Sequence, residues 1–261
     1  MPTDVVASVI ANHRLSPDYN VLSLAAPAVA AAASPGQFVM IRAGRGHVPL
    51  LRRPFSVFEV LRDRDGSPTG ISLLNKRIGV STGLLYAAQP GEGVGCLGPL
   101  GRPFSIVDRP TEAWMVAGGV GLAPFATLAE ALRGRGVTSV LFYGARRAAE
   151  LFHLDVFRGL GVELVLTTED GSLGEHGRIV APLERRLSSH PTDTPVIRRP
   201  ISSPGRAFHA ASKPAAAGTG SLAERGPVGW LLFVRRGVGA PVSGTTHRPA
   251  SAIAPSPRIT R

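Results

Sequence analysis

A glycine-rich turn between an apolar strand and a helix is the feature of this sequence that most constrains its fold. Residues 113–117 form an apolar run typical of a buried strand, and residues 125–133 have the spacing of a helix. The turn between them reads Gly-Gly-Val-Gly-Leu-Ala-Pro over residues 118–124. A strand that enters a helix through such a turn is the first half of a crossover between parallel strands. The chain should therefore contain a parallel sheet.

The alternation of strand and helix continues after this turn. Apolar strands are expected at residues 140–143 and 163–167, and helices are expected near residues 148–157 and 179–187. A further strand begins within residues 193–197, after which the pattern stops. The alternation predicts an α/β domain with a parallel sheet. We place this domain at residues 108–197 and regard it as incomplete, because the last elements of the sheet do not follow.

Residues 1–107 have a different pattern, that of short segments rich in β-forming side chains. Turn signals such as Ser34-Pro35-Gly36 and Asp65-Gly66-Ser67 separate these segments, and one helical stretch covers residues 81–88. Six strands are expected, at residues 5–12, 19–24, 37–42, 55–62, 70–76 and 93–97. Antiparallel strands at this spacing favour a small six-stranded β-barrel, since an open sheet would leave a long edge exposed. The fold class is thus two domains, a barrel followed by an α/β domain.

The positive charge of the chain is concentrated after residue 197. The net charge is +11, and nine of these charges fall in residues 198–261. That segment is rich in Ala, Gly, Pro, Ser and Arg, which predicts a disordered basic tail in which only residues 230–234 could form a strand. A nucleic-acid-binding protein is the weaker alternative, because the few aromatic residues of the tail lack the spacing of an RNA-binding motif. We expect no nucleic-acid partner.

Two further classes of protein are disfavoured by what the sequence lacks. No apolar run approaches the ~20 residues that span a bilayer, and the first residues do not have the pattern of a secretory signal. We therefore expect a cytoplasmic protein without a membrane partner. The single cysteine, Cys96, excludes a disulfide framework or a four-cysteine metal site within the chain, and we expect no metal-binding residues.

The first candidate binding motif lies at the start of an expected strand. It comprises Arg53, Pro54, Phe55 and Ser56. An arginine held by the following proline presents a rigid fork that suits a pyrophosphate. The hydroxyl of Ser56, two residues beyond the proline, could hydrogen-bond a flavin or its ribityl chain. The alternative is an exposed arginine pair beside an ordinary edge strand, and the motif alone favours that alternative.

The second candidate motif lies where an expected strand meets the helix at residues 81–88. Gly79, Ser81 and Thr82 are small, so backbone N–H groups and hydroxyls there could approach a phosphate at the start of the helix. The alternative is that Ser81 or Thr82 simply caps the helix.

The third candidate motif is the glycine-rich turn itself, with Gly118, Gly119, Gly121 and Pro124. Its spacing is G-x-G-x-x-P rather than G-x-G-x-x-G. Pro124 can begin a helix without losing a useful hydrogen-bond donor, and the glycines leave room for a pyrophosphate at the helix N-terminus. A tight turn without a ligand is the less favoured alternative, because the turn stands in the context that a dinucleotide site requires.

Two other features follow the expected strands of the α/β domain. Arg146 and Arg147 come after the second strand, where they could meet the 2′-phosphate of NADPH, so NADH and NADPH both remain open. His176 lies in the loop at residues 167–177, and we assign it no catalytic role because a lone loop histidine is usually just solvated.

The order of these motifs resembles the ferredoxin reductase-like superfamily, and within it the electron-transfer subunit of type B dihydroorotate dehydrogenase. The resemblance is carried by residues 49–57, 79–82, 98–101, 118–124 and 169–172. It implies FAD held by the motifs at residues 53–56 and 79–82, and NADH near residues 118–124. It also implies a [2Fe–2S] cluster that passes electrons to a catalytic dehydrogenase subunit in pyrimidine biosynthesis. No side chain of this chain is then catalytic, since the cofactors perform the redox chemistry.

The chain departs from this family after Ile197. A Cys-Gly-Pro element and a loop with four cysteines should follow there, and neither is present. One hypothesis is a frameshift near Arg198, because GC-rich codons read in another frame yield mostly Arg, Ala, Gly, Pro and Ser. The alternative is a genuine disordered extension. A stand-alone, cluster-free NAD(P)H reductase or diaphorase is accordingly the second functional hypothesis.

Overall fold

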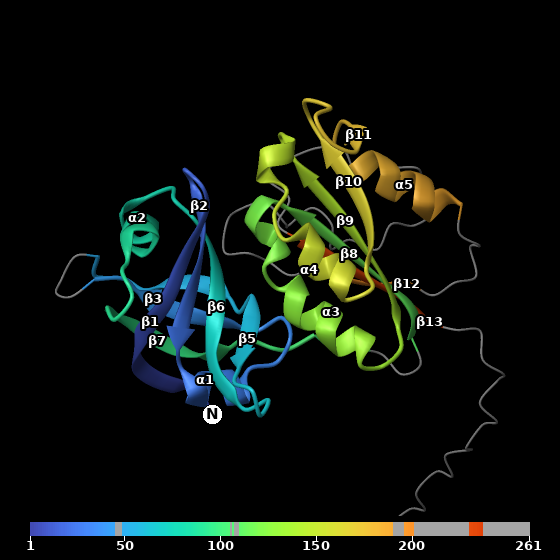
Figure 1. Ribbon diagram of the computed structural model, residues 1–261. Helices are drawn as coiled ribbons and strands as arrows, with labels where there is room; N and C mark the ends of the chain where they lie inside the picture. Colours follow the sequence, from blue (N-terminus) through green and yellow to red (C-terminus); the bar gives the residue numbers. More distant parts are fainter. Residues whose placement is uncertain (45–48, 105, 107–109, 190–195, 201–229, 237–261) are drawn as a thin grey trace, which may run out of the picture.

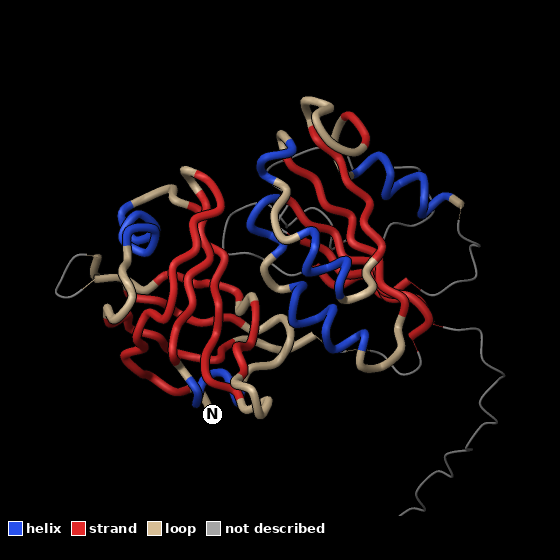
Figure 2. The backbone as a smooth tube through the Cα atoms, in the orientation of Figure 1, coloured by secondary structure: helices blue, strands red, loops and turns tan. Residues whose placement is uncertain are grey.

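Two β-sheets stand side by side in the structure, which is a computed structural model (Figure 1). It describes residues 1–44, 49–104, 106, 110–189, 196–200 and 230–236. The first sheet contains seven strands and the second contains six. Most helices lie with the second sheet (Figure 2). The expected succession of an antiparallel β-unit and a parallel α/β unit is therefore confirmed.

The first sheet is antiparallel throughout, with the strand order β4-β3-β7-β1-β2-β6-β5. Its strands are β1 (Thr3–Ser16), β2 (Tyr19–Ala25), β3 (Phe38–Arg42), β4 (Arg53–Ser56), β5 (Glu59–Arg62), β6 (Pro68–Lys76) and β7 (Gly93–Leu100). A closed barrel of six strands was expected, whereas the described sheet has seven strands and is open, with β4 and β5 at its two edges. The additional strand arises because residues 55–62 are divided. The Val57 N–H donates to Gln37 O at 3.1 Å, whereas the Phe58 N–H donates to Ser72 O at 2.9 Å. The chain thus changes from one edge of the sheet to the other.

Two short helices accompany the first sheet. Helix α2 (Val80–Ala87) corresponds to the helix expected at residues 81–88. Helix α1 (Pro27–Ala32) was not expected, although Pro27 at its first turn suits a helix start. Val29 and Ala30 of α1 are buried in the core of this sheet.

The second sheet has the expected parallel core. Strands β8 (Pro110–Gly118), β9 (Thr138–Ala145), β10 (Glu163–Thr168) and β11 (Glu175–His176) run parallel to one another. Ala113, Met115 and Ala117 of β8 share a core with α3 (Phe125–Arg133) and α4 (Leu154–Gly159), while Trp114 and Val116 pack with α5 (Val180–Ser188). This alternation along β8 places helices on both faces of the sheet. In the described part of the chain, no helix has the length and apolarity needed to cross a membrane.

The helix expected at residues 148–157 is wrong as a single element. It is divided into a 3₁₀ turn, η2 (Ala148–Glu150), and α4. The break falls at His153, whose φ of +58° is in the left-handed region. A left-handed residue cannot continue a right-handed helix, so the chain turns there before α4 begins.

Two segments after residue 195 form strands, at the two places where the sequence allowed one. Strand β12 (Val196–Pro200) continues past Ile197, and β13 (Trp230–Arg236) pairs antiparallel with both β12 and β8. The apolar run at residues 230–234 supplies β-forming residues, and β13 pairs with the β8 edge that β9 leaves open. Residues 201–229 and 237–261 lie outside the described part of the chain.

The two sheets share one hydrophobic core. Val21, Phe58 and Leu74 come from the first sheet, and they belong to the same buried cluster as Met115 and Leu122 of the second. Aromatic contacts reinforce this junction: the rings of Tyr19 and Phe152 are 4.8 Å apart, as are those of Phe58 and His153. The packing is therefore continuous from one sheet to the other.

Candidate functional site

The two consecutive arginines before β4 have different environments. Nη2 of Arg52 lies 2.9 Å from both carboxylate oxygens of Asp4 on β1, and the Arg52 side chain is only 22% exposed. Arg53 is exposed, and its Nη1 donates a 3.3 Å hydrogen bond to Arg52 O. Within the described residues no carboxylate pairs with Arg53. Arg52 therefore fastens the chain to β1, and the Arg53 guanidinium stays exposed at the surface.

Strand β4 presents Arg53 at an edge of the sheet. It pairs with β3 alone, with Arg53 opposite Ile41 and Pro54 opposite Met40. Pro54 has no N–H to donate, which an edge strand tolerates. Phe55 packs on the barrel core and Ser56 is half-buried. The four residues of the first motif thus form one short, anchored strand.

The turn before α2 uses the hydroxyl of Thr82 for its own structure. Thr82 Oγ1 accepts hydrogen bonds from the N–H groups of Ile78 (2.9 Å) and Gly79 (3.0 Å). It also donates to Gly79 O at 3.1 Å. A hydroxyl has one proton and two lone pairs. All three are used here, so the Thr82 hydroxyl has no capacity left for a ligand in this conformation.

Gly79 and Ser81 complete this turn in different ways. No atom lies within 4 Å of the position that a Cβ on Gly79 would occupy, so the backbone there is open to a ligand. Ser81, the second residue of α2, is buried. The structure therefore favours the Gly79 backbone as the accessible part of the second motif.

A group of asparagines beneath α2 was missed by sequence reasoning. Asn12, Asn20 and Asn75 come from three neighbouring strands, and their side chains bond to one another and to carbonyl groups of α2 and Ala88. The available signal was polar amides inside apolar strand segments, as in Leu73-Leu74-Asn75. Buried amides in strands require partners.

The third motif lies at the carboxyl end of β8. Gly118 ends the strand, Gly119 begins the 3₁₀ turn η1 (Gly119–Leu122), Gly121 is buried, and Pro124 directly precedes α3. Gly119 has a φ of +53°, and a Cβ on it would lie 3.5 Å from Oη of Tyr19. The need for glycine at position 119 is therefore explained by its left-handed backbone, independently of any ligand.

The two arginines after β9 share one buried carboxylate. Nη2 of Arg146 lies 2.9 Å from Oε1 of Glu150, and Nε of Arg147 lies 3.4 Å from the same oxygen. The Glu150 side chain is 10% exposed, whereas both arginines are about two-thirds exposed, at 67% and 64%. The hydrogen bond to Glu150 raises the pKa of Arg146. Glu150 thus fixes both guanidinium groups and offsets part of their charge.

The loop after β10 is tied to the turn that carries these arginines. The Asp170 N–H donates to Arg146 O at 3.1 Å, and the Ala148 N–H donates to Oγ of Ser172 at 2.7 Å. Hydrogen bonds from Ser172 lower the pKa of the Asp170 carboxyl. Nε2 of His176 is 2.9 Å from Glu169 O, so this exposed histidine contacts its own loop. The carboxyl ends of β8, β9 and β10 thus meet at one edge, where α/β sheets bind ligands.

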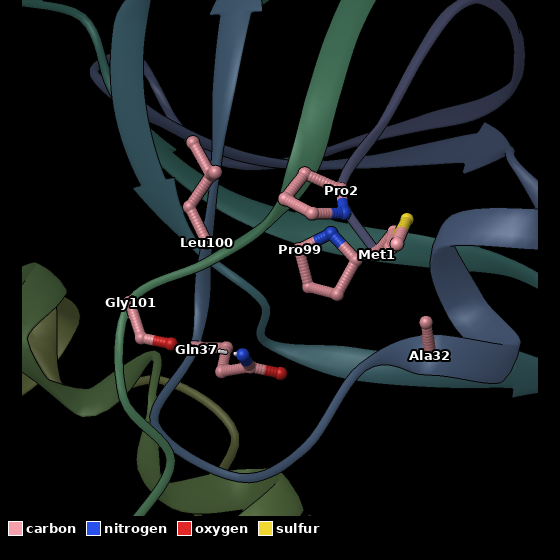
Figure 3. A pocket seen from close by; sticks show the side chains of 7 residues that line it. All are labelled: Met1, Pro2, Ala32, Gln37, Pro99, Leu100 and Gly101. Atoms are coloured by element: carbon pink, nitrogen blue, oxygen red, sulfur yellow. Dashed lines mark hydrogen bonds between the residues drawn. The ribbon is translucent and has the colours of Figure 1, made fainter.

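A hollow lies beside Met1, Gln37 and Pro99 (Figure 3). Its volume is about 310 Å³, and its lining residues are Met1, Pro2, Ala32, Gln37, Pro99, Leu100 and Gly101. Gln37 donates its side-chain N–H to Gly101 O at 2.9 Å on one side of it. None of the predicted site residues lines this hollow, and none of the lining side chains is charged.

The residues of this chain do not fit an iron–sulfur cluster. Cys96 is the only cysteine of the sequence. It is buried, and burial raises the pKa of its thiol to about 11, so it is protonated at neutral pH. A cluster requires four ligands, usually thiolates. The described residues also contain no group of three or more His, Cys, Asp or Glu that could hold a metal ion.

Comparison with curated proteins finds related electron transfer subunits. The chain is 34% identical to the dihydroorotate dehydrogenase B (NAD(+)) electron transfer subunit of Desulforamulus reducens. The 182 aligned residues cover 69% of this chain and 68% of that protein. It is 36% identical over 167 residues to the same subunit of Geobacillus thermodenitrificans, covering 63% of each chain. The chain thus spans between about half and two thirds of the length of the curated relatives it matches. No protein-family model matches it.

Comparison with solved structures supports the same fold. A chain of an NADH-dependent reduced ferredoxin-NADP oxidoreductase is 25% identical, with a TM-score of 0.61 over 71% of this chain and 64% of that one. A ferredoxin NADP+ reductase from Neisseria gonorrhoeae, solved with bound FAD and NADP, is 19% identical, with a TM-score of 0.59 over 72% and 77%. The second likeness concerns the fold alone. The expected ferredoxin reductase-like fold is confirmed.

Proposed function

Because the chain belongs to the family of dihydroorotate dehydrogenase B electron transfer subunits, we propose that it carries electrons from a nicotinamide dinucleotide through FAD to a partner enzyme. The partner in this proposal is a catalytic dehydrogenase subunit of pyrimidine biosynthesis, and the two form a hetero-oligomer. Bound FAD would accept a hydride from the nicotinamide and release single electrons. The side chains described above bind and orient; none is assigned a catalytic role.

The observation that carries the FAD proposal is the free guanidinium of Arg53. Asp4 engages Arg52, while Arg53 stands exposed at the edge strand β4 without a carboxylate partner among the described residues. An unpaired arginine fork suits a pyrophosphate. We assign to the same site Ser56, the open backbone at Gly79, and Ser81. Thr82 would shape the turn through its hydrogen bonds rather than contact the ligand directly.

The nicotinamide dinucleotide is assigned to the edge formed by β8, β9 and β10. Gly118, Gly119, Gly121 and Pro124 lead into α3, whose N-terminal N–H groups favour a pyrophosphate. Arg146 and Arg147 stand after β9, in the region that distinguishes NADPH from NADH in such sheets. Because Glu150 binds both, this chain's preference between the two nucleotides is left to the experiment below.

A second candidate function, a cluster-free reductase, is favoured by the single cysteine. The family resemblance implies a [2Fe–2S] cluster, but the only thiol of the sequence is the buried Cys96, so the residues of this chain do not fit one. Without a cluster, FAD would pass electrons directly to a small acceptor or a diffusing protein. The binding residues are the same in both proposals, and only the route out differs.

The test is to purify the full chain and measure its flavin, iron and acid-labile sulfide together. We expect FAD at about one per chain and reduction of that flavin by NADH or NADPH under anaerobic conditions. Transfer of electrons to a dihydroorotate dehydrogenase catalytic subunit would support the first function. FAD and diaphorase activity without such transfer would support the second, and iron and acid-labile sulfide are expected to be absent from both. A chain that binds no FAD would refute both.

A further inference from the structure

Three asparagines form a hydrogen-bonded ladder beneath α2. Asn20 on β2 lies directly opposite Asn75 on β6, and Asn12 comes from β1. Nδ2 of Asn75 donates to Oδ1 of Asn20 at 2.7 Å, and Nδ2 of Asn20 donates to Oδ1 of Asn12 at 2.7 Å. Asn20 and Asn75 are fully buried, at 0% and 1% exposure. The ladder therefore lies inside the barrel unit, at the end closed by α2.

The ladder holds α2 at both ends. At the N-terminal end, Nδ2 of Asn75 donates to Thr82 O at 3.0 Å. At the C-terminal end, Nδ2 of Asn12 lies 3.0 Å from Tyr86 O and 2.8 Å from Ala88 O. The carbonyls at a helix C-terminus have no partner within the helix, so Asn12 supplies one. An eight-residue helix is marginal alone, and these bonds fix its position.

Stability alone does not explain the ladder. Oδ1 of Asn75 is buried and has no hydrogen-bond partner among the described residues. A buried polar atom without a partner is costly, and apolar side chains of similar size often serve a core equally well. The amide of Asn75 is instead directed at the carbonyl of Thr82, the residue whose hydroxyl organises the turn at Gly79.

We propose that Asn12, Asn20 and Asn75 are positioning residues that fix α2 and its leading turn in the conformation that binds the FAD pyrophosphate. The inference rests on the proposed function, since it assigns a purpose to the same FAD site. The ladder links the strands of the barrel to Thr82, and Thr82 sets the turn that exposes the Gly79 backbone. Loosening the ladder therefore misplaces the binding groups although no ladder residue contacts the ligand.

The test compares Asn75→Leu with Ser72→Ala in the full chain. Ser72 is a matched control, because it is a fully buried polar residue on the same strand that bonds to Glu59 rather than to α2. FAD is titrated into each apoprotein, and hydrogen exchange of the α2 amides is measured. Asn75→Leu should weaken FAD binding at least tenfold and accelerate α2 exchange. Ser72→Ala should bind FAD within twofold of the wild type.

A second variant covers the possibility that Asn75→Leu does not fold. Asn12 is only half-buried, so Asn12→Ala should fold, and it should weaken FAD binding at least threefold with faster α2 exchange. FAD binding within twofold of the wild type in the folded variant would overturn the inference, as would an equal loss in Ser72→Ala. A wild-type chain that binds no FAD would overturn the proposed function and the inference together. The inference alone fails when the wild type binds FAD and the variants bind it equally well.

Discussion

Replacing Arg53 by alanine should weaken FAD binding without weakening the fold. The Arg53 side chain is exposed and makes one long hydrogen bond, at 3.3 Å, to the neighbouring Arg52 carbonyl. Its removal therefore leaves no buried group unpaired. A charge-assisted hydrogen bond to a pyrophosphate contributes about 1.5–3 kcal/mol. At about 1.4 kcal/mol per factor of ten, that loss corresponds to a roughly 10- to 160-fold weaker FAD affinity.

Arg52→Ala is the matched control, because the two arginines are adjacent and differ only in what they contact. Arg52 loses its ion pair with Asp4, so this variant should unfold at a lower temperature than the wild type. Its FAD affinity, measured at a temperature where it is folded, should fall less than that of Arg53→Ala. The assay is fluorescence titration of each apoprotein with FAD, together with thermal unfolding of the same samples. Equal FAD affinity in wild type and Arg53→Ala, or a larger loss in Arg52→Ala, would refute the assignment.

Three further expectations concern other parts of the chain. Gly121→Val, at a buried position of the turn after β8, should abolish reduction of the flavin by NADH while FAD stays bound; loss of both in a spectroscopic titration would contradict the separate placement of the two nucleotides. Burial lowers the pKa of His153, so the unfolded chain takes up a proton first as the pH falls below about 6.5, and stability declines there. Asparagine tolerates the left-handed backbone at this position, so His153→Asn should reduce the loss of unfolding free energy between pH 7.5 and 5.5, measured by urea unfolding. An unchanged dependence of the unfolding free energy on pH would show that His153 does not cause the decline. Re-sequencing the gene around Arg198 should reveal, in another forward frame, Cys-Gly-Pro and a cysteine cluster if a frameshift lies there, whereas a confirmed sequence without that cluster would favour the genuine extension.

The elements predicted from local pattern agree well with the structure. The helix expected at residues 125–133 is α3 itself, because an apolar stripe and the preceding proline mark its start. The 55–62 strand and the 148–157 helix were each divided by the fold. The strand breaks at Val57–Phe58 because the two residues pair with different partner segments. The helix breaks at His153 because the backbone there is left-handed. Neither property can be read from the types of the neighbouring residues.

The sequence indicates which motifs make up the candidate site, but not which atoms of each motif are available to a ligand. The motif at residues 53–56 does not reveal that Asp4, far away in sequence, would engage Arg52 and leave Arg53 free. Likewise, nothing in the spacing of Gly79 and Thr82 shows that the Thr82 hydroxyl is used by the turn. Such distinctions depend on contacts between distant segments. Sequence reasoning therefore located the motifs, and the fold determines which atoms remain available.

The common core of the two sheets has a consequence for how the chain unfolds. Val21, Phe58 and Leu74 are covered by residues of the second sheet, so a fragment ending near residue 107 would expose this apolar face to water. The change of pattern at that point thus separates two architectures without separating two autonomous folding units. The two sheets should therefore melt in a single cooperative transition, because neither can expose its share of the common core to water without loss of stability.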